Sequence, residues 1–133
     1  MLHPLVPYGM RGVIWYQGES NVNRAADYAV IFPAMIEDWR AQWGQGDFPF
    51  YFVQIAPFDY GRPFECATLR ESQAAALTLP ATGMVVTMDV GNPKDIHPLA
   101  KEPVGHRLAL MARKDVYGHD LVARAPSYLC REL

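Results

Sequence analysis

Asp95 and His97 are a pair of residues whose types and spacing suit acid–base chemistry. Only Ile96 separates them, so in an extended stretch both side chains can point the same way. A carboxylate that accepts a hydrogen bond from the imidazole Nδ1 leaves Nε2 free to act as a general base. Pro98 follows and stiffens the backbone that carries the histidine. We therefore take Asp95 and His97 as a candidate acid and base for nucleophilic catalysis, with a plain surface hydrogen bond as the alternative.

A second candidate group is Gln17, Gly18 and Glu19, with Asn21 close behind. Glycine allows the backbone to approach a ligand closely, and the glutamine amide is a neutral donor suited to an oxyanion forming on a carbonyl carbon. Glu19 can accept from the imidazole in addition to Asp95, or orient it instead. The alternative is structural: Gln17 and Asn21 then satisfy loop backbone groups and cap the next helix, while Glu19 is solvated.

The sequence shows no clear nucleophile for such a reaction. The serines are Ser20, Ser72 and Ser127, and none lies in a strand-to-helix turn of glycine and serine that presents a reactive hydroxyl. Cys66, at the start of an expected helix, is the other candidate as a thiolate, although nothing basic adjoins it in sequence. A cysteine hydrolase that uses Cys66 is therefore a separate hypothesis.

Metal ions and charged polymers are not indicated as partners. The histidines have no spacing typical of a metal site; they are His3, His97, His106 and His119. The formal net charge is −2 and no basic run occurs, so neither nucleic acid nor an anionic membrane surface is expected. The apolar stretches end well short of the roughly 20 residues that a membrane-spanning helix needs. With so few cysteines, Cys66 and Cys130 are expected to be free thiols.

Three apolar segments are expected to be interior strands that position the polar groups: Val13–Tyr16, Phe50–Ala56 and Met84–Asp89. They are rich in β-branched and aromatic residues without alternation, which is typical of strands covered on both faces. Gln17 then lies at the carboxyl end of the first strand, where parallel sheets bind their ligands. Asp89, at the end of the third, is either a further carboxylate near His97 or the cap of a turn.

Helical periodicity follows each strand. Apolar residues recur at steps of three and four in the segments Tyr28–Trp43, Phe64 or Glu65 to Leu77, and Pro103–Tyr117. Asn21 or Asn23 is expected to cap the first helix, and Pro33 to bend it or mark a restart. The loop between Pro57 and Pro63, which contains Phe58 and Tyr60, is long enough to lie over a site.

The alternation of strand and helix predicts one α/β domain in which crossover helices join parallel strands. Parallel strands end at one edge of a sheet. The loop that begins at Gln17 and the loop that carries His97, 80 residues later, should therefore leave from the same edge. We expect the two loops to share one site.

Five segments taken together resemble a known family. They are GVIWYQGESN at 12–21, FPAMIEDWR at 32–40, FPFYFVQIA at 48–56, LRESQ at 69–73 and DIHPLAKEPVGHRLA at 95–109. In this order, over about residues 1–118, the chain is similar to the sialate O-acetylesterases, which are carbohydrate esterases of the SGNH-hydrolase superfamily.

The resemblance implies a flavodoxin-like three-layer α/β/α sandwich with a parallel sheet, and serine-dependent removal of acetyl groups from sugars without metal or cofactor. His97 matches the catalytic base of the family. Gln17 matches the block that supplies an oxyanion-hole side chain, with Gly18 and Glu19 beside it. Asp95 stands two residues before the histidine where the superfamily usually has three, so Glu19 stays a rival for the orienting role.

The resemblance also places the serine nucleophile, in a glycine-aspartate-serine turn, and a second oxyanion donor upstream of these residues. We therefore expect residues 1–133 to be a single partial esterase domain, incomplete at its N-terminal side. Its first strand would have an unpaired apolar edge that favours self-association. An acetylated sugar or glycan is the expected substrate, and a periplasmic or secreted location is implied if the protein is like its family. The alternative is a catalytically inactive carbohydrate-binding remnant.

Overall fold

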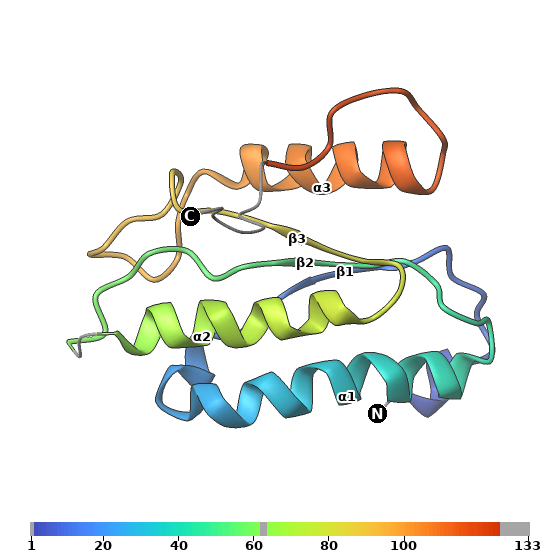
Figure 1. Ribbon diagram of the computed structural model, residues 1–133, viewed down its shortest axis with the longest axis horizontal. Helices are drawn as coiled ribbons and strands as arrows, with labels where there is room; N and C mark the ends of the chain where they lie inside the picture. Colours follow the sequence, from blue (N-terminus) through green and yellow to red (C-terminus); the bar gives the residue numbers. More distant parts are fainter. Residues whose placement is uncertain (1, 62–63, 126–133) are drawn as a thin grey trace, which may run out of the picture.

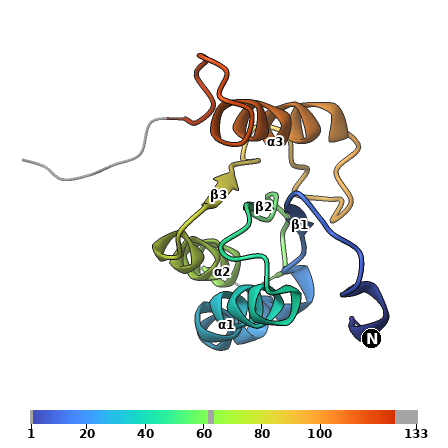
Figure 2. The same ribbon diagram turned by 90° about the vertical axis from the view of Figure 1, so that its right-hand side faces the viewer.

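The computed structural model describes residues 2–61 and 64–125, and it has three layers of secondary structure (Figure 1). Along the chain the elements are η1 (His3–Leu5), β1 (Val13–Tyr16), η2 (Glu19–Arg24), α1 (Ala25–Trp43), β2 (Phe50–Val53), α2 (Glu65–Ala74), η3 (Ala75–Thr78), β3 (Thr82–Val85) and α3 (Lys101–Asp115). Helices α1 and α2 cover one face of the sheet, and α3 covers the other (Figure 2). The predicted α/β/α sandwich is confirmed.

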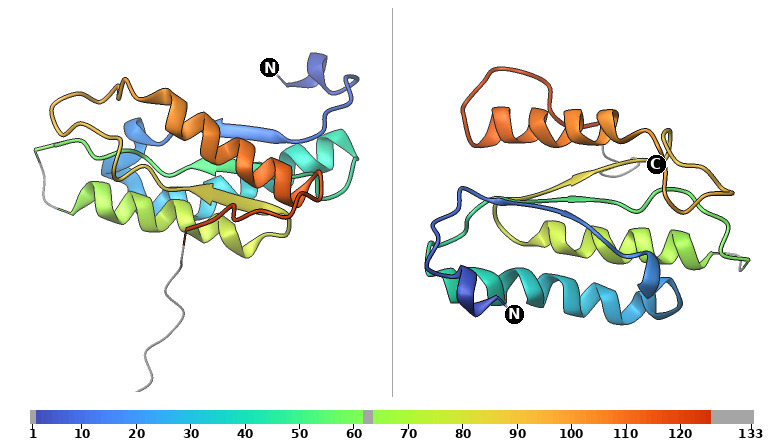
Figure 3. Two further views of the ribbon diagram at one scale, coloured as in Figure 1. Left: turned by 90° about the horizontal axis from the view of Figure 1, so that it is seen from above. Right: turned by 180° about the vertical axis from the view of Figure 1, so that it is seen from behind.

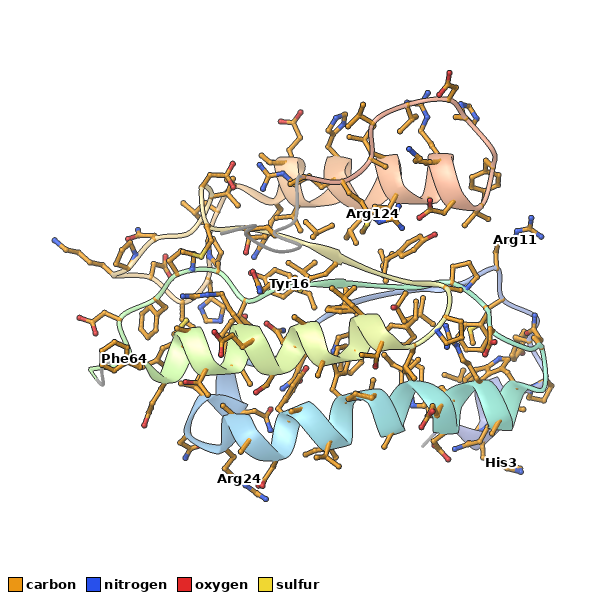
Figure 4. The ribbon with its side chains drawn as sticks, viewed as in Figure 1. His3, Arg11, Tyr16, Arg24, Phe64 and Arg124 are labelled. Carbon is orange, nitrogen blue, oxygen red and sulfur yellow. The ribbon has the colours of Figure 1, made fainter. Side chains whose placement is uncertain are left out.

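The sheet is parallel throughout, with the strands in the order β1-β2-β3. Val13 of β1 is paired with Phe50 of β2, which is paired with Thr82 of β3. All three strands therefore end at the same edge of the sheet, which we call the carboxyl edge. In Figure 4, Arg24 and Phe64, which precede α1 and α2, lie toward this end of the molecule, while Arg11 and His3 lie at the other.

The central strand explains why the sequence shows no alternation. All four residues of β2 are buried because both faces of this strand are covered. Phe50 and Phe52 pack with Phe32 and Ile36 of α1 in the larger core. The intervening Tyr51 packs on the opposite face in a smaller cluster beneath α3.

β1 has its predicted bounds, whereas β2 and β3 are shorter than predicted. β2 ends at Val53 because the side chain of Gln73 takes the next backbone groups, donating to the Val53 carbonyl and accepting from the Ile55 N–H. The third strand was expected over residues 84–89, but β3 spans Thr82–Val85. Its last backbone contact is from the Gln54 N–H to the Val85 carbonyl, after which the Thr87 hydroxyl donates to the Gln54 carbonyl.

The asparagine cap expected for the first helix is wrong, and of the bend or restart expected at Pro33 the restart does not occur. Neither Asn21 nor Asn23 caps it, because residues 19–24 form the 3-10 turn η2 and the cap position is Arg24. Pro33 does not start a new helix: α1 runs through it, since Phe32 and Ile36 on either side both pack in the core. The helix ends at Gly44, whose N–H donates to the Arg40 carbonyl.

Candidate active site

Gln17 follows β1 directly, and its side-chain amide is held by two neighbours. Its Nε2 donates to Asn21 Oδ1 at 2.7 Å. The Tyr28 hydroxyl, from α1, lies 3.1 Å from Gln17 Oε1 and 3.2 Å from the Gln17 carbonyl oxygen. The second N–H of the Gln17 amide has no partner within residues 2–61 and 64–125. One amide donor is thus left for a ligand.

Gly18 allows this loop to pass against the core. Its φ of 151° is one that residues with side chains rarely adopt. A Cβ at this position would lie 2.9 Å from Ile55 Cγ2 and 3.2 Å from Gln73 Nε2. The close approach predicted for this glycine is therefore made to two other residues of the protein: Ile55, which follows β2, and Gln73 of α2.

Gln73 of α2 connects the ends of two strands and was missed from the sequence. Its side chain is fully buried. Nε2 donates to the carbonyls of Gln17 and Val53, and Oε1 accepts from the Ile55 N–H. The available signal was an amide residue at a position where the helical period calls for an apolar one.

Asp95 and His97 lie together in the loop between β3 and α3. The His97 N–H donates to Asp95 Oδ1 at 2.9 Å, which closes a local turn. His97 Nδ1 is 4.0 Å from the same oxygen, beyond hydrogen-bond distance but close enough for ion pairing. The His97 side chain is 89% exposed and that of Asp95 47%, so the imidazole is open to an approaching group.

Contacts between loops bring the two candidate groups to the same edge. Lys101, which follows the histidine loop, places Nζ 5.0 Å from the ring centre of Tyr16, the residue before Gln17. The Asp59 N–H donates to the Pro93 carbonyl at 2.9 Å, which joins the loops after β2 and β3. Figure 3 shows these loops at one end of the sheet. In the described ranges no hydrogen bond joins Gln17 to His97 directly.

Glu19 lies among tyrosines. Within the described part of the chain its carboxylate forms no ion pair with His97, whose acidic neighbour is Asp95. Burial, and then the charge of Glu19, raises the pKa of Tyr16. Burial, and then the nearby ionisable groups Cys66 and Glu19, raise the pKa of Tyr60 to about 12. Tyr60 therefore stays protonated at neutral pH.

The alternative nucleophiles have different surroundings. Cys66 is a free thiol, as expected, and Arg70 Nη1 lies 2.7 Å from its sulfur, one helical turn later. A basic group therefore adjoins Cys66 in space, although none does in sequence. Ser72 is buried in α2, and Ser20 is exposed in η2. Ser127 and Cys130 lie outside the described residues.

Metal-binding clusters and membrane-spanning helices are absent from the described part of the chain. No group of three or more His, Cys, Asp or Glu residues there can hold a metal ion. No helix there is long and apolar enough to cross a membrane. A cavity of about 630 Å³ lies at the outer side of β3, and a cavity of about 190 Å³ lies beside the start of β1. Neither cavity is lined by Gln17 or His97.

Comparisons with known proteins agree on one family. A family model described as "Carbohydrate esterase, sialic acid-specific acetylesterase" matches residues 4–114. The sialate O-acetylesterases of Mus musculus and Homo sapiens are 39% and 38% identical over 142 aligned residues, which cover 89% of this chain. The chain spans 26% of the length of these relatives. A crystal structure of a carbohydrate acetylesterase from Xanthomonas citri matches with a TM-score of 0.90 and 52% identity, over 95% of this chain and 31% of that one.

Proposed function

This chain belongs to the sialic acid-specific acetylesterase family of carbohydrate esterases, and we propose that it supplies the base and an oxyanion donor for removing acetyl groups from sugars. The observation that supports this best is the placement of two groups after parallel strands. Gln17, with one free amide N–H, follows β1, and the Asp95–His97 pair follows β3 at the same edge. An acetylated sugar or glycan is the substrate class.

In the proposed reaction a serine oxygen attacks the acetyl carbonyl carbon while His97 Nε2 takes the serine proton. Asp95 orients the imidazole and stabilises its positive charge. The Gln17 N–H donates to the oxygen that becomes negative in the tetrahedral intermediate. The intermediate then expels the sugar oxygen, which receives the proton from His97. Water, deprotonated by His97, hydrolyses the acetyl-serine and releases acetate.

We place the nucleophile in a part of the esterase outside these 133 residues, because the sequence contains no glycine-aspartate-serine turn. Asp95 takes the orienting role rather than Glu19, because Asp95 Oδ1 is the carboxylate oxygen beside His97 Nδ1. Gly18 and Asn21 act by shaping the loop and holding Gln17.

A chimera tests these roles. The segment of the Xanthomonas citri esterase that matches this chain is replaced by residues 1–125, and hydrolysis of p-nitrophenyl acetate and of an O-acetylated sialic acid is measured. We expect turnover, which His97→Asn lowers at least about a thousandfold and Gln17→Ala lowers about a hundredfold. The matched controls are His106→Asn and Gln42→Ala, at exposed positions of α3 and α1, and they should retain full activity.

The same chimera separates the remaining alternatives. Asp95→Asn should lower kcat more than Glu19→Gln, and the reverse order would assign the orienting role to Glu19. Full activity of His97→Asn would refute the proposal. A chimera that binds the acetylated sugar, as measured by calorimetry, but never hydrolyses it would favour the carbohydrate-binding remnant.

A further inference from the structure

We propose that Gln73 and Tyr28 are positioning residues that determine which end of the Gln17 amide faces the substrate. The inference rests on the proposed role of Gln17 as an oxyanion donor. An amide presents a donor at one end and an acceptor at the other, so a reversed Gln17 would point an oxygen at the developing negative charge. Something in the fold must therefore set its orientation.

The orientation of Gln73 is fixed by backbone groups alone. Its Oε1 is 2.9 Å from the Ile55 nitrogen, and a backbone N–H is only a donor. Its Nε2 lies 3.1 Å from the Gln17 carbonyl oxygen and 3.2 Å from that of Val53, and both are only acceptors. The reversed amide would leave three backbone groups, two of them buried, facing the wrong partner. Gln73, with 0% exposure, therefore has one orientation.

The fixed Gln73 makes Gln17 Oε1 the better acceptor for the Tyr28 proton, because Gln73 already occupies one lone pair of the Gln17 carbonyl. The Tyr28 hydroxyl lies between two oxygens of Gln17, the carbonyl at 3.2 Å and Oε1 at 3.1 Å, and it has one proton to donate. Gln73 Nε2 already donates to the carbonyl. The Tyr28 proton is thus available to Gln17 Oε1.

The amide of Gln17 is then fully assigned. With Oε1 bound to Tyr28, Nε2 faces Asn21 Oδ1 at 2.7 Å and keeps one N–H for a ligand. The Ile55 N–H donates to Gln73, and Gln73 and Tyr28 each donate to a different oxygen of Gln17. A connected, partly buried network of this kind is stiff, which an oxyanion donor requires because it must be in place before charge develops.

The orientation is tested by NMR of the isolated chain, through the side-chain amide resonances of Gln17 and the protection of their N–H groups from hydrogen exchange. We expect Tyr28→Phe and Gln73→Met each to speed this exchange about tenfold or more, since a protecting partner of the network is lost. The matched controls are Gln54→Met, which removes a glutamine that donates to the Arg70 carbonyl instead, and Tyr51→Phe, whose hydroxyl faces Asp115. Both should leave the Gln17 resonances unchanged.

Kinetics of the chimera give the second measurement. Tyr28→Phe should lower kcat about tenfold with little change in KM, because the donor is misplaced while the sugar contacts remain. If Gln73→Met does not fold, Tyr28→Phe decides alone. Unchanged Gln17 amide exchange in Tyr28→Phe overturns the inference whatever the activity. Full activity of Gln17→Ala refutes the role of Gln17 in the proposed function. The NMR result still decides whether Tyr28 and Gln73 position the Gln17 amide.

Discussion

Gly18 has a backbone conformation that places it between the candidate oxyanion donor and the core. Its φ is 151°, and it is packed against Ile55 and Gln73. A methyl group here would add both strain and a contact of 2.9 Å to Ile55 Cγ2. The residue that lets the loop turn is thus also the one that lets Gln73 reach the Gln17 carbonyl.

We predict that Gly18→Ala destabilises the fold by about 2 kcal/mol, from backbone strain and overpacking. Urea unfolding monitored by circular dichroism measures the change. Gly105→Ala is the matched control, because Gly105 lies in α3 without a left-handed φ, and a methyl group added there would meet no atom within 4 Å. It should stabilise the protein by about 0.5–1 kcal/mol. Equal stability of Gly18→Ala and the wild type would contradict the packing described for this loop.

The loop between β3 and α3 is the element that carries Asp95 and His97, and it is anchored at its start. Arg107 of α3 donates to the Val86 carbonyl at 2.7 Å and pairs with Asp89 through two nitrogens. Asp89 therefore pairs with Arg107, a partner that neither of the two roles expected from the sequence included. Hydrogen bonding from Arg107 lowers the pKa of Asp89.

We predict that Arg107→Gln loosens this loop while α3 stays folded. Hydrogen exchange of the backbone amides of residues 86–99 should become several-fold faster, because the start of the loop loses its anchor. Arg113→Gln, at an exposed position on the same helix, is the control and should leave this exchange unchanged. Equal protection in Arg107→Gln and the wild type would show that the Arg107–Asp89 contact does not anchor the loop.

The same contact predicts a pH dependence. The pKa of Asp89 is lower in the folded protein than in the unfolded chain, so the folded state binds fewer protons. The stabilising contribution is then present above the ordinary aspartate pKa of about 4 and is lost as the pH falls through the lowered value. The protection of residues 86–99, relative to the intrinsic exchange rate at each pH, should fall on acidification below about pH 4 in the wild type, and this step should be absent in Arg107→Gln.

At the scale of the whole molecule, the sheet formed by the described residues has two unpaired edges, β1 and β3. Ile14 of β1 points to the face covered by α3 but remains 69% exposed, beside the cavity of about 190 Å³. An apolar edge strand with free backbone groups is a template for pairing with another chain.

We predict that the isolated chain self-associates through β1. Ile14→Lys should shift sedimentation towards the monomer, because a charge on an edge strand opposes pairing. Leu99→Lys, at a 93% exposed site in the loop before α3, is the control and should leave the association unchanged. A wild-type chain that sediments as a monomer at all concentrations would refute this prediction.

Local patterns in the sequence determined much of the fold. The β-branched and aromatic residues of 13–16 predicted β1 with its observed bounds, and Gly44 predicted the end of α1. The alternation of strands and helices was enough to predict a parallel sheet. Parallel topology in turn placed the loops of Gln17 and His97 at one edge, because all parallel strands end on the same side. The five quoted motifs were sufficient to identify the family.

Only the tertiary structure decided which side chains contact one another. β3 ends at Val85 because the next backbone acceptor, the Gln54 carbonyl, binds the Thr87 hydroxyl instead of a backbone N–H, which the apolar residues after Val85 do not reveal. Gln73 and Tyr28 follow the helical period like core residues, yet their polar atoms meet Gln17, which is 56 and 11 residues away in the sequence. Periodicity depends on neighbours along one element, whereas a buried hydrogen bond depends on which elements pack together. The sequence determined the elements and their order, and packing determined the network around Gln17.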